Sequence, residues 1–438
     1  MKKIYFLLSL FIVVHSFAQE KTDTITANRF SFHAQATVVN QNKAGFAAPY
    51  TGTNSLIIDH ESQTSITSTL YLGARLWKGA SVFVNSEIAG GSGLSQVLGL
   101  GDATNGETFR VGSTAPKVYL ARAYFTQLFK LSEATVFQED GANQIQERIP
   151  TNYFAFTIGK ISLADYFDDN SYAKDPRTQF MNWGLMANGA WDYAANTRGY
   201  TSGVVVEYVT PKNEFRYNIS LLPLMANGND MNWNVSKQQA QNVEYTRHFK
   251  WMKRPGAIRV LGYLNSASMG NYRESIALNP TNPDIISDRQ YGRKKYGFGL
   301  NAEQKLNSYL GAFARASWND GANETWAFTE IDRSFSIGLS ATGEQWKRSN
   351  DRVGLAYLTS GLSNQHKEYL QAGGYGFMLG DGKLNYAWEQ VTELYYSAEL
   401  TKKQLYVTGG YQMIVNPGYN ADRKGPVHVF SIRVHLEI

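Results

Sequence analysis

The sequence predicts an all-β fold, a transmembrane antiparallel β-barrel of about sixteen strands with one inward-folded loop that carries a short helix. Three observations predict it. The chain of 438 residues begins with an export signal, continues in long segments that alternate polar and apolar residues, and ends on a segment of the same kind. Exported chains built from such segments are typical of barrels in the bacterial outer membrane.

The export signal occupies residues 1–18. Lys2 and Lys3 precede an apolar run from Ile4 to Val14, and small residues suited to cleavage follow at Ser16 and Ala18. This order is typical of a secretory signal peptide. The apolar run is too short for a membrane anchor, which needs about 20 residues, and the chain has no Cys for lipid attachment. We therefore expect a cleaved signal peptide at 1–18 and a single mature domain at 19–438.

The composition narrows the class of exported protein further. An exported chain without Cys has no disulfides, so an extensive hydrogen-bonded scaffold or a large core must hold it together. Removal of Lys2 and Lys3 takes the formal net charge from +5 to about +3. A mature chain so close to neutrality has no basic stripe for nucleic acid and no strong field for an anionic solute.

The alternating segments begin near residue 29, and roughly sixteen of them, of about 10–14 residues each, fill the chain. In SITSTLYLGARLW one face is apolar, with Ile66, Leu70, Leu72 and Leu76. The opposite face carries Thr67, Thr69, Tyr71 and Arg75. ASVFVNSEIAG sets Val82, Val84 and Ile88 against Phe83, Asn85 and Glu87. VYLARAYFTQLF sets Tyr119, Ala121, Ala123, Phe125 and Phe129 against Arg122, Tyr124 and Thr126.

A soluble sandwich or propeller is the alternative, since its strands also alternate. Strands in those folds usually run about 5–6 residues, and propellers repeat a blade motif, which this sequence lacks. A closed barrel explains the longer segments, because every backbone amide in the hydrocarbon must be paired. The final segment, PVHVFSIRVHLEI, ends the chain on an apolar Ile438, as outer-membrane barrels end on a closing strand. Sixteen strands leave an aqueous channel inside.

One long segment, from about 165 to 193, interrupts this rhythm. It includes DNSYAKDPRTQFMNWG, residues 169–184, whose acids, bases, Asn and Trp show no strand pattern. Asp175 followed by Pro176 predicts a helix start, and Asn188 with Gly189 predicts its end. We expect about three helical turns over 177–187. The segment could lie outside or fold into the lumen, and its polar mixture suits a wet lumen wall.

Several stretches resemble the carbohydrate-selective porin family of the OprB type. They are GSGLSQVLGLGDATNGETFRVGSTAPKVYLARAYFTQ at 91–127, DYFDDNSYAKDPRTQFMNWGLMANGAWDYAANTRGYTSG at 165–203, YLQAGGYGFMLGDGKLNYAWEQVTELYYSAEL and GGYQMIVNPGYNADRKGPVHVF. The resemblance implies a sixteen-stranded outer-membrane barrel that admits monosaccharides and small sugars by passive diffusion. It also implies a constriction of inward loops and charged wall residues, which favours the lumen for 165–193.

A sugar presents hydroxyl groups around its ring and an apolar face. A sugar-selective channel therefore requires fixed hydrogen-bond donors and acceptors for the hydroxyls and aromatic rings for the apolar face. Strand parity turns Arg75, Glu87 and Arg122 inward, although ordinary solvated wall charges would give the same pattern. In the inward loop the candidates for solute contact are Asp168, Asp169, Arg177, Asn182, Trp183, Trp191 and Asp192. The alternative for both Trp residues is packing within the loop. Asp175 is better explained as a helix cap. For Arg110, which lies in a stretch that resembles the family, a structural salt bridge is as plausible as solute contact, and anchoring of the loop is an alternative for Arg198.

The sequence gives little support for metal binding or catalysis. The seven His residues are scattered without metal-ligand spacing, and His60 with Ser62 is too weak a basis for a hydrolase. We expect no enzyme activity, no cofactor, no metal and no nucleic acid. The expected partners are small neutral sugars and outer-membrane lipid, with the chain as a monomer or homotrimer. A general or ion-selective porin and a secreted β-rich sugar-binding protein remain alternatives. Residues 270–293 are expected to form a long external loop.

Overall fold

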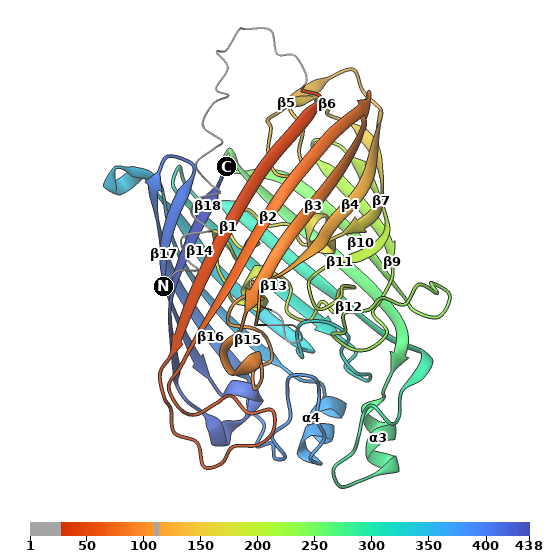
Figure 1. Ribbon diagram of the computed structural model, residues 1–438, viewed down its shortest axis with the longest axis vertical. Coiled ribbons are helices and arrows are strands. Elements are labelled where there is room, and N and C mark those ends of the chain that lie inside the picture. Colours follow the sequence, from red (N-terminus) through yellow and green to blue (C-terminus); the bar gives the residue numbers. More distant parts are fainter. Residues whose placement is uncertain (1–27, 109–113) are drawn as a thin grey trace.

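The computed structural model describes residues 28–108 and 114–438, and its dominant element is one closed antiparallel barrel. Sixteen strands form the wall (Figure 1), in the order β1-β18-β17-β16-β15-β14-β13-β12-β11-β10-β9-β8-β7-β4-β3-β2. β1 closes the ring by pairing with both β2 and β18, so that Val38 lies opposite Ile66 on one side and Val434 on the other. The predicted barrel of sixteen strands is confirmed.

The wall strands of the first half are β1 (Phe30–Lys43), β2 (Glu61–Trp77), β3 (Ala80–Gly91), β4 (Lys117–Lys130), β7 (Tyr153–Ile161), β8 (Thr201–Val209), β9 (Asn213–Ser220) and β10 (Gln239–Trp251). Those of the second half are β11 (Arg254–Met269), β12 (Gln290–Lys305), β13 (Leu310–Asn319), β14 (Arg333–Gly343), β15 (Arg348–Gly361), β16 (Glu389–Thr401), β17 (Leu405–Val415) and β18 (Val427–Glu437). A separate two-stranded hairpin, β5 (Thr135–Gln138) and β6 (Glu147–Pro150), lies between β4 and β7.

The two faces of the wall follow the predicted alternation. On β2, Leu72 is 43% exposed on the outer, lipid-facing surface, whereas Thr69 is 1% exposed inside the barrel. On β3, Val84 is likewise exposed and Asn85 is fully buried. Apolar side chains therefore cover the outside, where the hydrocarbon of the bilayer would contact them, and polar side chains line the lumen.

β4 departs from strict alternation at one point. Asn85 of β3 pairs with Arg122, but the next residue, Ser86, pairs with Leu120, so Ala121 forms a β-bulge. The expectation that Tyr119 and Arg122 lie on opposite faces is therefore wrong. The extra residue turns both side chains into the lumen, while Leu120 stays on the outer surface.

The two ends of the barrel differ in their connections. At one end most strands are joined by two to four residues, as at 252–253 and 306–309. At the other end the connections are long and carry α3 (Tyr272–Leu278) and α4 (Asn364–Gln371), which lie together below the barrel in Figure 1. Short turns face the periplasm in outer-membrane barrels, so the long loops are extracellular.

Residues 270–293 include α3, and Tyr272 stacks on His366 of α4 at 4.3 Å.

None of the helices within 28–108 and 114–438 has the length and apolar character needed to cross a membrane.

The segment that joins β7 to β8, residues 162–200, folds into the lumen. Arg315 of β13 donates to the carbonyl oxygens of Leu185 (2.9 Å) and Ala173 (2.7 Å), and Arg433 of β18 donates to Gln179 O (2.9 Å). These wall strands lie across the barrel from β7 and β8 in the strand order. The predicted inward loop with a short helix is confirmed.

The helix within this loop is shorter than expected. α2 (Trp183–Met186) is one turn long, and Asn182 caps it by accepting the Leu185 N–H at 3.2 Å. The prediction of three turns from Asp175 is wrong, because Glu393 of β16 accepts the backbone N–H groups of Met181 (2.7 Å) and Asn182 (2.9 Å). A continuous helix would use both donors internally.

Candidate channel constriction

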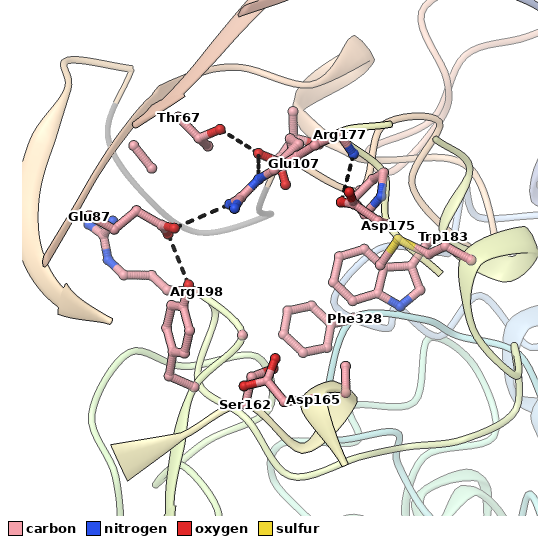
Figure 2. Close-up of a pocket in the computed structure, with 18 of the residues that line it drawn as sticks. Thr67, Glu87, Glu107, Ser162, Asp165, Asp175, Arg177, Trp183, Arg198 and Phe328 are labelled. Carbon is pink, nitrogen blue, oxygen red and sulfur yellow. Dashed lines mark hydrogen bonds and ion pairs between the residues drawn. The ribbon is translucent and has the colours of Figure 1, made fainter. Parts of the chain in front are cut away.

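A central cavity of about 300 Å³ lies inside the barrel, between the wall strands β2–β4 and the inward segment 162–200 (Figure 2). The wall contributes Glu87 and Arg122, and the inward segment contributes Asp165, Arg177 and Trp183. The extracellular loop 92–116 adds further lining residues. In Figure 2, Glu87 and Arg198 lie on one side of the space, with Trp183 and Phe328 on the other.

Arg177 crosses the cavity wall between two carboxylates. Its Nε donates to Glu107 Oε2 at 2.8 Å and its Nη2 to Glu87 Oε2 at 3.2 Å, while Nη1 reaches the Tyr71 hydroxyl at 3.2 Å. Burial alone would lower the pKa of Arg177, but the carboxylates of Glu107 and Glu87 outweigh burial and raise that pKa well above its ordinary value. The guanidinium is therefore a fixed positive charge in a planar fork.

Glu87 is the most heavily bonded acid of this wall. Besides Arg177 it accepts hydrogen bonds from Thr69 (2.6 Å), Tyr200 (3.1 Å) and Tyr119. Four donors satisfy a carboxylate that is almost fully buried. Glu87 thus fixes the position of Arg177 and of two tyrosine rings, one of which is covered by the guanidinium of Arg198 at 4.1 Å from its centroid.

Arg122 and Asp165 form the second ion pair of the cavity. Arg122 donates from Nε and Nη2 to the two carboxylate oxygens of Asp165, both at 2.7 Å, and its guanidinium lies over the Tyr200 ring at 5.2 Å. The Asp165 side chain remains 35% exposed. This bidentate pair therefore leaves carboxylate surface open to a solute.

An aromatic cluster forms the opposite face. The rings of Trp183 and Phe328 stack at 4.4 Å with an interplanar angle of 18°, and Tyr193 stacks on Phe328 at 5.0 Å. All three line the cavity. The charges of the cavity balance: among the described lining residues, four basic side chains (Arg122, Lys174, Arg177 and Arg198) accompany four acidic ones (Glu87, Glu107, Asp165 and Asp175).

The structure brings four of the ten predicted site residues together at this cavity: Glu87, Arg122, Arg177 and Trp183. Arg75 faces inward as its parity predicted but lies at the periplasmic rim, where it lines a depression together with Arg29, Glu147 and Arg148. The expected grouping of Arg75 with Glu87 and Arg122 is therefore wrong. Asp169 lies beside the cavity without lining it and pairs with Lys174 at 2.6 Å.

The expected solute contact of Asp168 and Asn182 is also contradicted by their positions. Asp168 is buried against Arg315, with Oδ1 3.0 Å from the guanidinium Nε, and it accepts the Asn188 N–H at 2.6 Å. Asn182 is buried as the cap of α2 and donates to Asp102 at 2.9 Å. Both side chains are used to fold the loop, which their local sequence does not reveal.

Trp191 and Asp192 are buried in the same way. Trp191 Nε1 donates to Asn242 Oδ1 of β10 at 2.9 Å. Asp192 accepts the backbone N–H groups of Trp326 (3.0 Å) and Ala327 (2.7 Å), and burial raises its pKa to about 6. Trp191 thus joins the inward segment to the wall strand β10, and Asp192 joins it to the extracellular loop 320–332. Neither residue lines the central cavity. For Trp191 the structure therefore agrees with the alternative interpretation, in which the ring packs inside the protein.

Sequence reasoning missed several lining residues. Glu107 lies in the first stretch that resembles the family but outside the alternating segments, so no strand parity could assign it to the lumen. Tyr119 was assigned to the wrong face because of the bulge at Ala121. Phe328 lies in a long loop with no pattern that marks it. Asp175 both lines the cavity and caps a local turn, accepting from the Arg177 N–H at 3.0 Å. The signal peptide at 1–18 and Arg110 lie outside the described residues.

Within the two described ranges, no group of three or more His, Asp or Glu side chains is placed to hold a metal ion. The arrangement instead consists of fixed ion pairs, hydroxyls and stacked rings around a cavity of about 300 Å³ in a membrane barrel. A closed sixteen-stranded barrel with an apolar outer surface, an inward loop and a polar constriction is the architecture of an outer-membrane porin.

Comparison with known proteins identifies the family. The model of the "Carbohydrate-selective porin, OprB family" matches residues 53–437, and the chain belongs to that family. Its members are channel proteins, and the protein is located in the bacterial outer membrane. No curated protein matches the chain.

Solved structures support the fold. The chain is similar to the high-pH structure of Pseudomonas putida OprB, with a TM-score of 0.71 and 16% identity over 94% of each chain. It is less similar to the outer membrane channel DcaP of Acinetobacter baumannii, with a TM-score of 0.52 and 10% identity over 96% of this chain and 100% of the other. At these identities the likeness concerns the fold alone.

Proposed function

We propose that the protein lets small neutral carbohydrates, monosaccharides such as glucose, diffuse passively across the outer membrane into the periplasm. The observation that supports this most is that the central cavity is lined by both fixed charges and an apolar aromatic surface. Its lining includes the ion-paired Arg122, Asp165 and Arg177 and the stacked rings of Trp183 and Phe328.

These two kinds of surface complement a sugar ring. Hydroxyl groups can accept from the guanidinium groups and donate to the exposed oxygens of Asp165, while the apolar C–H face of the ring can slide along the aromatic cluster. Because the wall groups are already held by their own partners, a passing sugar meets ordered donors and acceptors without reorganising them. Binding that is weak and exchangeable is what diffusion through a channel requires.

The size and charge of the cavity favour the same solute class. A space of about 300 Å³ is at the lower end of ligand-sized cavities and suits one ring rather than an extended chain. Equal numbers of described acidic and basic lining residues give a field without a dominant sign, which favours neutral solutes over ions. The proposed contacts of the solute are Arg122, Arg177 and Trp183, with Asp165 and Phe328 added, and Glu87 holds Arg177 in position.

No chemical change of the solute is part of this proposal, and transport follows the concentration gradient. Outer-membrane lipid would surround the apolar outer surface. The oligomeric state, a monomer or a homotrimer, stays a prediction.

A liposome-swelling assay on reconstituted protein tests the proposal, with glucose, a disaccharide and a neutral amino acid of similar size to glucose compared at equal osmolarity. We expect glucose to enter faster than the amino acid and faster than the disaccharide. Rates ordered by solute size alone would show a general diffusion porin on the same scaffold. Exclusion of all three solutes with retained ion conductance would indicate an ion-selective channel.

A further inference from the structure

The barrel contains a second cavity, of about 380 Å³, on the periplasmic side of the constriction. Inward-facing residues of β3, β4, β7 and β8 form its wall, among them Phe83, Tyr124 and Thr157. Asp165 and Lys174 line both this exit cavity and the central cavity. A solute that passes these two side chains on its way to the periplasm therefore enters the exit cavity.

The hairpin of β5 and β6 closes one side of the exit cavity. It belongs to the connection 131–152, whereas the other turns between described strands at the periplasmic end have two to four residues. Seven hairpin residues line the cavity: Gln138, Ala142, Asn143, Gln144, Ile145, Glu147 and Ile149. The hairpin thus covers part of the lumen, and Figure 1 shows β5 and β6 at the barrel end opposite α3 and α4.

Specific contacts hold the hairpin in this position. Asn85, fully buried on β3, donates to Asn143 Oδ1 at 2.8 Å, and Ser31 of β1 donates to Gln144 O at 3.2 Å. His33 lies 3.4 Å from Asp140, and Ile145 is buried. A turn that served only to join β4 and β7 would need none of these contacts.

The lining of the exit cavity has the chemistry of a carbohydrate site. The amides of Gln138, Asn143 and Gln144 each present donors and acceptors, and Glu147 and Glu207 present acceptors. Tyr124 contributes a ring that packs on Phe83 at 5.3 Å. Among the described lining residues Lys174 is the single basic side chain, so this cavity is richer in acceptors than the balanced central cavity and suits neutral hydroxyl groups.

We propose that the exit cavity is a second binding site for a neutral sugar ring, and that the 131–152 hairpin governs release of the sugar into the periplasm. This inference rests on the proposed function, because it takes the central cavity to deliver a sugar. A sugar would pass from the Trp183 face to Asp165 and Lys174, and then to the amides and Tyr124 below. Two successive sites give conduction with selectivity, since neither has to bind tightly.

The experiment measures the block of ion current by glucose in planar bilayers, with glucose added to each side in turn. One variant replaces residues 133–150 with an Asn-Gly turn, which the backbone bond from Leu131 N to Asn152 O (2.9 Å) makes feasible. A second variant, Glu147→Ala, keeps the hairpin. The control is Glu139→Ala, which removes an exposed carboxylate of the same hairpin that does not line the cavity.

We expect the deletion and Glu147→Ala to shorten the blocked periods by about two- to tenfold, the range of one or two lost hydrogen bonds, and more strongly for glucose added from the periplasmic side. Glu139→Ala should behave as wild type. If the wild-type current is blocked by glucose but both hairpin variants match it, the exit site is contradicted and the proposed function stands. If glucose never blocks wild type, the proposed function and this inference fail together.

Discussion

The inward segment 162–200 has two faces that use the same residue types differently. Its face toward β12–β18 is sealed: Asp168 pairs with Arg315, whose side chain is 1% exposed, and Arg433 donates to loop carbonyl oxygens. Its face toward β2–β4 is open, and there Arg122 pairs with a partly exposed Asp165. The channel therefore runs along one side of the lumen.

A charged side chain inside this barrel therefore has one of two roles. On the sealed face, carboxylates and guanidinium groups satisfy backbone amides and carbonyls that would otherwise be buried without partners, at a cost of about 1–3 kcal/mol each. On the open face, charges pair with one another and keep surface available to the lumen. Four experiments test whether the two faces differ in this way.

The largest effect is expected for Arg315→Ala on the sealed face. The change leaves the Asp168 carboxylate buried without its cation and removes the donor to three carbonyl oxygens, which costs about 3–5 kcal/mol. We expect the loop to detach, single-channel conductance to rise severalfold and the thermal midpoint to fall. Arg333→Ala, at an exposed position of β14, is the control. A conductance equal to wild type in Arg315→Ala would mean that other contacts suffice to seal this face.

Neutralising a charge on the open face should change ion selectivity and leave the fold intact. Arg122→Gln leaves Asp165 as an uncompensated negative charge in the constriction, so the cation-to-anion permeability ratio should rise by roughly fivefold, or about 1 kcal/mol. Arg75→Gln, at the periplasmic rim, should change the ratio far less. Reversal potentials in a salt gradient measure both. Equal shifts would place the selectivity filter at the rim.

Removal of the aromatic face should act on sugars more than on ions. Trp183→Ala removes a ring that stacks on Phe328, and we expect the glucose preference over a neutral amino acid to fall by roughly two- to tenfold, since such ring contacts contribute about 0.5–1.5 kcal/mol. Trp183→Phe should keep most of the preference. Liposome-swelling rates measure this preference. If Trp183→Ala leaves the preference for glucose unchanged, the aromatic cluster does not contribute to sugar selectivity.

The smallest effect concerns pH and the sealed face. Burial raises the pKa of Asp102 to about 7, although the hydrogen bonds that Asn182 and Gly184 donate to its carboxylate act to lower that pKa. An unfolded Asp has a pKa of about 4, so the neutral carboxyl stabilises the fold fully below that pH and the stabilisation is lost as the pH rises through about 7. The thermal midpoint should therefore fall between about pH 4 and pH 7, and fall less in Asp102→Asn. Parallel curves for the two proteins would contradict this.

Strand residues were predictable from the sequence where a period of two applies without interruption. Glu87 and Arg122 were assigned to the lumen because each lies on a polar strand face. Tyr119 was not, because a one-residue bulge at Ala121 reverses the parity of everything before it. Nothing in the sequence of β4 marks that bulge.

Loop residues were predictable as a group but not one by one. Asp165 and Asp168 are three residues apart, yet Asp165 faces the lumen beside Arg122 and Asp168 is buried beside Arg315. Their partners lie 43 and 147 residues away along the chain. Only the barrel's closure decides which acid meets which arginine, so the sequence could propose the loop without separating its anchors from its lining.

The most direct test uses the absence of Cys from the chain. A single Cys is placed at Ala164, a partly exposed residue of the central cavity, or at Ser336, a buried lumen-facing residue of β14 on the sealed side. A charged, water-soluble thiol reagent is then added while single-channel current is recorded. We predict that the current of Ala164→Cys drops and that of Ser336→Cys does not change. A block at Ser336→Cys, with none at Ala164→Cys, would contradict a channel that runs along β2–β4.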